Sequence, residues 1–275
     1  SLFLVQHTPA SLRYAYADSV ILSAIHDSLI PGAVLCVVAN QDIVYLQAYG
    51  HRRIVPVHEA MTPHTIFDLA SVSKPLGAGT AMLVLCAEGK ANVDDYVSQY
   101  IHNYHSDVQI RHLMTHYSGL PAYMNATRLD SMFSSRAIPS QRYPYAMIDT
   151  IARCHRPSKV GEKYRYSCLN FISLQRVVES IVGMDINRYL RSTLYADLEV
   201  AMGWLPDTTL LADIAPTECQ DTCCLQGQVH DPLARVMMKG ISGNAGLFAT
   251  AQEVATWAIW FMQLSQDVRE KGCNA

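Results

Sequence analysis

The sequence predicts an α+β fold in which an antiparallel hairpin near the beginning of the chain accompanies a mostly helical middle region. Two β-rich runs, 33–39 and 43–49, are separated by Asn40-Gln41-Asp42, which is typical of a hairpin turn. Helical patterns then dominate the middle of the chain. Half of the 275 residues are hydrophobic, so the chain can bury a large core in one or two domains.

The helices are predicted from the spacing of apolar residues. Residues 18–29 place Ile21, Ile25 and Leu29 on one face, and Pro31-Gly32 ends that helix. Helices are also predicted at 76–88, 94–101, 110–116, 171–181 and 252–264, with Gly183 as a stop for the fourth of these. Residues 124–141 are polar and irregular, and we expect them to form a loop that covers a cleft.

The composition limits the kind of ligand. Charged residues make up 16% of the chain, the net charge is −3 and the isoelectric point is near 6.4. This leaves no basic surface for nucleic acid or an anionic membrane, and a small-molecule or peptide substrate is expected instead. Apolar runs such as 33–39 are too short to span a bilayer, so we expect no membrane span.

The tetrad Ser71-Val72-Ser73-Lys74 is the strongest candidate for chemistry. Residues i and i+3 of a helix share one face, so the amine of Lys74 can reach the hydroxyl of Ser71. Pro75 lacks a backbone N–H, which is harmless only in a first turn, so the helix is predicted to begin near Ser71. Negative charge developing on a substrate carbonyl would be stabilised at that helix end, and Lys74 could take the serine proton.

The tetrad alone leaves a second interpretation open. Ser71 and Ser73 could simply cap the helix that follows, as serine often does. Residues 76–88 are apolar nearly all round, which is typical of a helix at the centre of a domain. A serine at the mouth of such a helix is held rigidly, and this context favours the catalytic interpretation.

Cysteines and histidines give no defined metal site. Cys36 and Cys86 lie in apolar runs and are expected to be buried free thiols. Cys219, Cys223 and Cys224 could form a disulfide or hold a soft metal, but the spacing supports neither well. The histidines that cluster in sequence, at 102, 105, 112 and 116, lack an acidic third ligand. We therefore expect no metal and no cofactor, and we expect His116 to support the loop before Gly119.

Three motifs in order give the chain a resemblance to a known family. They are residues 71–74 (SVSK), 111–121 (RHLMTHYSGLP) and 166–171 (YSCLNF). In this order they resemble the serine beta-lactamase-like family, which contains class C beta-lactamases, penicillin-binding DD-peptidases and related esterases. The similarity runs from about residue 30 to residue 250, most of the chain.

The resemblance implies a fold, a mechanism and a location. It implies a beta-lactamase/transpeptidase-like fold with helices flanking an antiparallel sheet, and an extracytoplasmic protein. Ser71 matches the acylated nucleophile, and Lys74 matches the lysine that activates it. Tyr166 matches the tyrosine that moves a proton between the serine and the leaving group. A core tyrosine is the alternative for Tyr166, and the matching residues around it favour the functional role.

The chain departs from the family pattern at two places, one in the middle motif and one at the expected third motif. Cys168 replaces an asparagine that would hold a substrate amide, and a thiol is a poor donor. This weakens the case for lactam hydrolysis more than the case for ester hydrolysis, and Asn170 is a candidate to compensate. The only look-alike of the third motif is Asn244-Ala245-Gly246, whereas residues 246–251 match a family segment that leads into a helix.

The predicted organisation has two subdomains. Residues 1–70 and 240–275 are expected to form the sheet subdomain, and residues 71–239 a mostly helical one, with the active-site cleft at their junction. Because the third motif is not recognised, we expect the sheet to be incomplete in this chain, with an open edge that a partner segment or second chain completes. The chain alone would then lack a second oxyanion donor and be a poor catalyst.

The motifs favour a serine acyl hydrolase that forms an acyl-enzyme on Ser71 and acts on an ester, amide or lactam carbonyl. A cell-wall DD-peptidase is the enzymatic alternative. A module that recognises penicillin without turnover, or a relic of the fold, is the non-enzymatic one. A covalent probe separates these candidates. Labelling with turnover would support a hydrolase, stable labelling a recognition module, and absence of labelling a relic.

Overall fold

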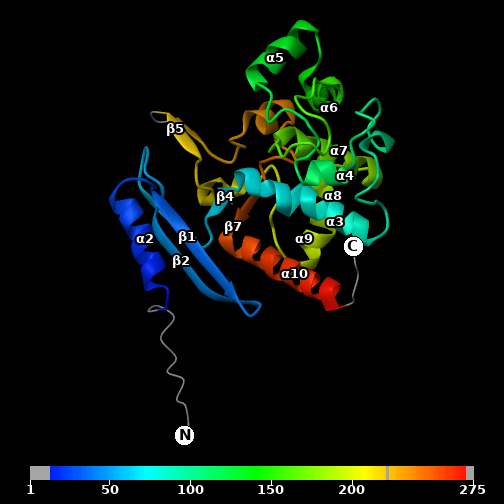
Figure 1. Cartoon of the computed structure of the whole chain (residues 1–275). Coiled ribbons are helices and arrows are strands. Elements are labelled where there is room, and N and C mark those ends of the chain that lie inside the picture. The colour runs from blue at the N-terminus through cyan, green and yellow to red at the C-terminus, as the bar shows by residue number, and fades with distance from the viewer. Residues whose placement is uncertain (1–12, 221–222, 271–275) are drawn as a thin grey trace. The chain divides into compact units, whose positions relative to one another are not determined.

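The computed structural model describes residues 13–220 and 223–270, which form two compact units. Of the described residues, the first unit holds 13–67, 209–220, 223–226 and 249–270, and the second holds 68–208 and 227–248. Helices and small antiparallel sheets make up the described residues, so the predicted α+β class is confirmed (Figure 1). The two units are described separately below.

The first unit contains the predicted hairpin. Strands β1 (Gly32–Ala39) and β2 (Asp42–Arg53) pair antiparallel, and the short β3 (Glu59–Ala60) pairs with the end of β2. Asn40 and Gln41 connect β1 to β2 with positive φ angles of 53° and 67°, the conformation of a two-residue hairpin turn. Among the described residues β1 has one hydrogen-bonded neighbour, and the completion of its other edge stays a prediction.

Two helices of this unit pack on the hairpin. Helix α2 (Ala15–His26) ends three residues before the predicted limit, and Ser28 turns the chain with φ 57°. The Tyr45 hydroxyl donates to Asp18 of α2 at 2.9 Å, which fixes the helix on β2. Helix α10 (Ala251–Glu270) follows the short strand β7 (Phe248–Thr250) and contacts β1 and β2. The prediction that residues 246–251 lead into a helix is therefore confirmed.

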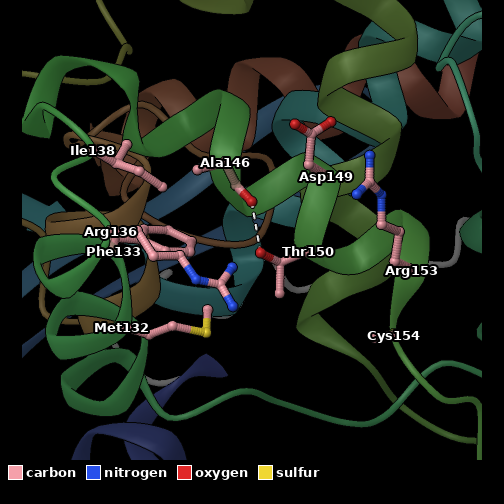
Figure 2. Close-up of a pocket in the computed structure, with 9 residues that line it drawn as sticks. All are labelled: Met132, Phe133, Arg136, Ile138, Ala146, Asp149, Thr150, Arg153 and Cys154. Atoms are coloured by element: carbon pink, nitrogen blue, oxygen red, sulfur yellow. Dashed lines mark hydrogen bonds between the residues drawn. The ribbon is translucent and has the colours of Figure 1, made fainter.

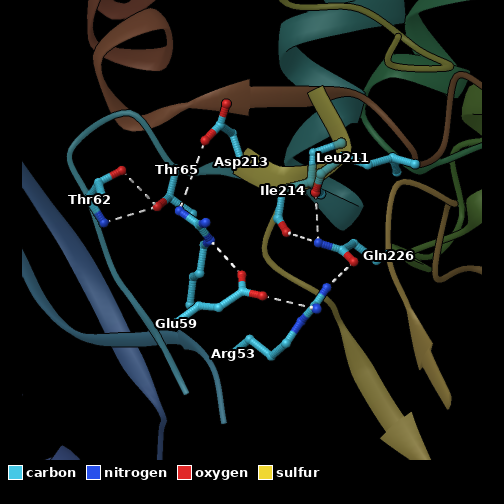
Figure 3. Close-up of polar contacts among 9 residues, drawn as sticks. Arg53, Glu59, Thr62, Thr65, Leu211, Asp213, Ile214 and Gln226 are labelled. Carbon is cyan, nitrogen blue, oxygen red and sulfur yellow. Dashed lines mark hydrogen bonds and ion pairs between the residues drawn. The ribbon is translucent and has the colours of Figure 1, made fainter. Parts of the chain in front are cut away.

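The segment 209–226 corrects the predicted subdomain boundary, because it belongs to the unit that holds the sheet. Its polar contacts explain this (Figure 3). Glu59 accepts from Arg52 Nε and Arg53 Nη1 at 3.1 Å each, and Arg53 also donates to Gln226. Gln226 Nε2 in turn donates to Leu211 O and Ile214 O at 2.7 Å, which closes the loop onto β2 and β3. Residues 240–248 likewise cluster with the helical unit, not with the sheet.

The cysteine cluster also differs from expectation. Strands β5 (Glu218–Gln220) and β6 (Cys223–Leu225) pair so that Cys219 lies opposite Cys224, and these two form a disulfide. Cys223 remains a free, exposed thiol. Cys36 and Cys86 are free as predicted, but they are only half-buried.

The second unit is mostly helical. Its elements are η1 (Ala70–Val72), η2 (Lys74–Gly79), α3 (Thr80–Ala87), η3 (Val97–Gln99), α4 (Ile110–Met114), α5 (Ala126–Ser135), η4 (Ser140–Arg142), α6 (Tyr143–Arg153), α7 (Cys168–Val182), α8 (Ile186–Ser192), α9 (Leu194–Asp197) and η6 (Leu233–Met237). The helix expected at 94–101 is reduced to the single turn η3. The loop expected at 124–141 contains α5, whose first turn is capped by the Asn125 side chain accepting from Arg128 N at 2.8 Å.

The core of this unit surrounds α7. This helix packs against η2, α3, α4, α6 and α8, and it ends at Gly183 in the left-handed conformation, as predicted. The run Ala70–Ala87 is long and apolar enough to cross a membrane by length and composition, but 56% of it is buried inside the protein. It is the central helix that the apolar run 76–88 predicted.

Candidate active site

The nucleophile candidate and its lysine lie on consecutive turns of the central helical run. Lys74 Nζ donates to Ser71 Oγ at 2.9 Å, so the predicted i, i+3 contact is present. Lys74 is buried, with 3% of its surface exposed, whereas Ser71 is exposed. The serine hydroxyl is therefore accessible to a ligand while its partner amine is fixed inside the protein.

The turn that presents Ser71 is braced by an aspartate. Ala70 has φ 45°, an unfavourable left-handed conformation for a residue with a Cβ. Asp68 Oδ1 accepts from Ala70 N at 2.9 Å, and its other oxygen accepts from His230 N at 2.8 Å. The carboxylate thus holds the bend immediately before the nucleophile. Sequence reasoning missed Asp68, although its place three residues before Ser71 was the available signal.

Residues 244–247 run beside the same turn. Lys74 Nζ donates to Asn244 O at 2.8 Å, and Leu247 N donates to the buried Ser73 Oγ at 2.9 Å. Trp204 supports the segment by donating from Nε1 to Ala245 O at 3.1 Å. The capping role considered for Ser73 is thereby replaced by a tertiary contact, because its oxygen accepts from a residue far along the chain.

The look-alike of the third motif serves mainly to hold the lysine. Ala245 N donates to Ser242 O at 3.3 Å, and Leu247 N is engaged by Ser73. Asn244 is completely buried, and its Nδ2 donates to Asp231 Oδ1 at 3.2 Å. The backbone N–H groups of Ala245 and Leu247 thus already have acceptors inside the protein, and neither is free to bind an oxyanion.

Tyr166 lies against the buried lysine. The Lys74 Nζ is 4.9 Å from the centroid of the Tyr166 ring, a cation–π contact, and Tyr166 as a residue is 43% exposed. The structure thus brings Ser71, Lys74 and Tyr166 together from segments almost a hundred residues apart. Ser71 and Tyr166 are both exposed and both contact Lys74, so we expect one ligand to reach both.

Cys168 lies next to this group, at the first residue of α7. Its thiol lies near enough to Lys74 and Asn244 for both side chains to affect its pKa. Burial raises the pKa of the Cys168 thiol, and the neighbouring Lys74 opposes this effect only in part. The structure therefore places Cys168 near Lys74, with a thiol that is neutral at ordinary pH, and its role in substrate binding stays a prediction.

Asn170 does not lie where a substrate could contact it. The residue is completely buried, its Oδ1 accepts from the Ser118 hydroxyl, and its Nδ2 approaches His116 Nδ1 at 3.0 Å. Both ends of the amide are satisfied inside the protein. The interpretation of Asn170 as a compensating substrate-binding residue is therefore corrected. Asn170 connects Ser118 to His116 inside the helical unit, whereas Cys168, two residues earlier, lies near Lys74.

His116 supports the loop before Gly119, as the sequence predicts, and also joins it to Tyr166. Its Nδ1 accepts from Ser167 N at 3.2 Å, and its ring lies 4.6 Å from the ring of Tyr166. Burial, aided by the charge of Lys74, lowers the pKa of His116 to about 4. The imidazole is therefore neutral at ordinary pH, with Nδ1 as the acceptor and the proton on Nε2.

The other histidines of the sequence cluster have separate roles. His112 Nδ1 accepts from Gln109 N at 3.0 Å within the first turn of α4, and His105 Nε2 lies 3.3 Å from Ile151 O. Among residues 13–220 and 223–270, no three His, Cys, Asp or Glu side chains come together as metal ligands would. The clustering in sequence does not become a cluster in space.

A separate cavity of about 400 Å³ lies in the helical unit (Figure 2). It is lined by Met132, Phe133, Arg136, Ile138, Ala146, Asp149, Thr150, Arg153 and Cys154, from α5, α6 and the residues that follow each. None of these residues contacts Ser71, Lys74 or Tyr166 in the described structure. This cavity is distinct from the serine site.

Comparison with known proteins finds one family model and several relatives that match most of the chain. A family model described as Beta-lactamase matches residues 17–272. A protein of Escherichia coli O157:H7 named "Putative D-alanyl-D-alanine carboxypeptidase" is 26% identical over 269 residues, which cover 83% of this chain and 59% of that protein. A protein of the same name from Salmonella agona (strain SL483) is 29% identical, with 83% and 60% covered. The chain spans about 60% of the length of these curated relatives.

Solved structures share the fold at low sequence identity. A class C beta lactamase superimposes with a TM-score of 0.73 at 19% identity, covering 92% of this chain and 66% of that chain. EstCE1, a hydrolase with promiscuous acyltransferase activity, gives 0.70 at 20% identity, covering 90% and 72%. An octameric penicillin-binding protein homologue from Pyrococcus abyssi gives 0.72 at 20% identity, covering 90% and 56%. At these identities the likeness establishes the fold.

Proposed function

The chain belongs to the beta-lactamase family, and from this membership we propose that it is a serine acyl hydrolase that forms an acyl-enzyme on Ser71. The observation that carries the proposal is the 2.9 Å contact between Lys74 Nζ and Ser71 Oγ, with the exposed Tyr166 ring beside the lysine. A nucleophile within hydrogen-bond reach of a fixed base is the arrangement that covalent catalysis requires.

The proposed reaction has two steps. Ser71 Oγ attacks a substrate carbonyl carbon while its proton passes to Lys74 Nζ, which must be the neutral amine at this step, or is relayed through the Tyr166 hydroxyl, and then goes to the leaving group. The bond from carbonyl carbon to leaving group breaks, which leaves the acyl group on Ser71. Water then attacks the acyl carbon, the same groups remove its proton, and Ser71 departs as the protonated alcohol.

The residues around the lysine favour ester substrates over lactams and peptides. Cys168 is a half-buried thiol and a poor hydrogen-bond donor, so it offers little to a substrate amide carbonyl. Asn170 is enclosed by its own contacts and does not replace it. A DD-carboxypeptidase acting on cell-wall peptides is the second candidate, favoured by the names of the curated relatives. An extracytoplasmic location is part of either proposal.

A covalent probe tests the proposal. We expect a fluorescent alkyl fluorophosphonate to label the purified protein on Ser71, and Ser71→Ala to abolish both labelling and phenyl ester hydrolysis. Ser131→Ala, which changes an exposed serine of α5, is the matched control and should keep both. Lys74→Ala and Tyr166→Phe should slow acylation by at least a hundredfold, as loss of acid–base groups does.

The outcomes separate the candidates. An adduct on a serine other than Ser71 would overturn the assignment. Stable labelling by a fluorescent penicillin without release would favour a recognition module, and release of D-alanine from a D-alanyl-D-alanine peptide at a rate above that of esters would favour the carboxypeptidase. A protein that no probe labels would be a catalytically inert member of the family.

A further inference from the structure

Three exposed tyrosines lie in a row that begins at the serine site. Tyr166 is 43% exposed, Tyr164 57% and Tyr117 37%. All belong to the helical unit, and they come from two segments, 116–117 and 164–166, that are adjacent in space. An exposed aromatic side chain that stands alone needs no explanation, but exposed apolar surface gathered in one place marks a candidate binding surface.

The ring contacts connect the row to Lys74. The lysine Nζ lies over Tyr166, whose ring lies 4.6 Å from the ring of His116. The His116 ring is 6.0 Å from Tyr164 in an edge-on contact, and Tyr164 is 5.9 Å from Tyr117, also edge-on. We call the exposed rings of Tyr117, Tyr164 and Tyr166 the tyrosine row. The buried His116 is its supporting layer.

The backbone under the tyrosine row is held on both sides. Gly161 N donates to Tyr117 O and Arg165 N donates to His116 O, both at 2.9 Å, so the two segments are tied together. The rings of Tyr164 and Tyr166 both contact the ring of the buried His116, so one side chain supports both of them. Gly119 allows the close approach, because a Cβ there would collide with the Ser158 carbonyl. Such a surface binds with little loss of conformational entropy.

We propose that the tyrosine row binds the leaving group of the substrate, and that this leaving group carries a flat aryl ring. The inference rests on the proposed function, because the role given to Tyr166 is to pass a proton to the leaving group. A row that continues outward from Tyr166 then lies on the leaving-group side of the reacting carbonyl. Aryl rings pack against tyrosine rings by offset or edge-on contact, in addition to the area they bury.

The position of Lys74 favours a neutral ring over a cation. The Lys74 amine lies over the Tyr166 ring, 4.9 Å from its centroid. An ammonium group on the leaving group would have to compete with this amine for the Tyr166 face, and the protonated form of Lys74 would repel it. The substrate class that fits is therefore an ester of an aryl alcohol, without positive charge on the leaving group.

The test compares phenyl acetate with 2-naphthyl acetate. The two esters share an acyl group, and their phenols have nearly the same acidity, so their chemical reactivity is similar while the flat area differs. We expect kcat/KM of the unmodified protein to be about two- to tenfold higher for the naphthyl ester. Tyr164→Ala and Tyr117→Ala should bring this ratio close to one, whereas Tyr164→Phe, which keeps the ring, should retain it.

Tyr145→Ala is the matched control. Tyr145 is 54% exposed on α6 and contacts Arg142 and Arg176, not the tyrosine row, so its removal should leave the ratio and both rates unchanged. A ratio near one in the unmodified protein, or a ratio that survives both alanine variants, would overturn the proposal. If neither ester is hydrolysed and Ser71 is not labelled, it is the proposed function that fails, which is a distinguishable result.

Discussion

The His116→Asn variant should flatten the dependence of stability on pH between pH 7 and pH 4. In the folded protein His116 Nδ1 accepts from Ser167 N and faces Asn170 Nδ2, so a proton on Nδ1 would remove both contacts. Burial and the charge of Lys74 lower the pKa of His116 from 6.5 to about 4. Above pH 6.5 the imidazole is neutral in both the folded and the unfolded chain, so the two Nδ1 contacts contribute fully to the free energy of unfolding.

The magnitude follows from the two pKa values. As the pH falls below 6.5 the unfolded chain takes up a proton first, and stability is lost until the pH passes the folded-state pKa of about 4. At about 1.4 kcal/mol for each pH unit in this window, the loss is ~3 kcal/mol. Asparagine is a suitable replacement because His116 has φ 64°, which asparagine tolerates, and because its side-chain oxygen can accept.

Urea unfolding at several pH values, followed by tryptophan fluorescence, measures the effect. The free energy of unfolding of the unmodified protein should fall by ~3 kcal/mol more than that of His116→Asn between pH 7 and pH 4. His155→Asn is the control, since His155 is exposed and holds no buried contact of this kind. Parallel pH profiles for the unmodified protein and His116→Asn would refute the reasoning.

Two other predictions test the assignments around the lysine. Asn170→Ala should lower the free energy of unfolding by ~1–3 kcal/mol, because Ser118 and His116 lose a buried partner. An unchanged urea midpoint would contradict the structural role given to Asn170. Iodoacetamide should alkylate Cys168 more slowly than the exposed Cys223, since burial raises the pKa of the Cys168 thiol. An acyl group on Ser71 should slow Cys168 further without affecting Cys223, and mass spectrometry of the two peptides reads both rates.

The local pattern of the sequence was sufficient for several elements. The hairpin, the central apolar helix and the stop of α7 at Gly183 depend on turn residues and on periodicity, which are properties of neighbouring residues. The contact between Ser71 and Lys74 was predictable for the same reason, because i and i+3 share a helix face. Helix α5 was also readable, since Asn125 and the spacing of the buried residues 126, 129 and 133 are helix signals within a polar segment.

Contacts between distant segments could not be predicted in this way. Asn170 and Cys168 are two residues apart on one helix, and only the packing of α7 decides that one is enclosed by His116 and Ser118 while the other faces Lys74. The Cys219–Cys224 disulfide depends on the register of a hairpin whose strands have three residues each.

The sequence alone determined the family, the nucleophile candidate and the order of the motifs, because these reside in short runs of residues. The tertiary structure decided three things that the sequence did not. It assigned residues 209–226 to the unit that holds the sheet, and it gave Lys74 the carbonyl of Asn244 as a partner. It also brought Tyr117, His116 and Tyr164 together. The physical reason is that a buried polar group must find its partner wherever packing brings one, and that partner is often far away in the chain.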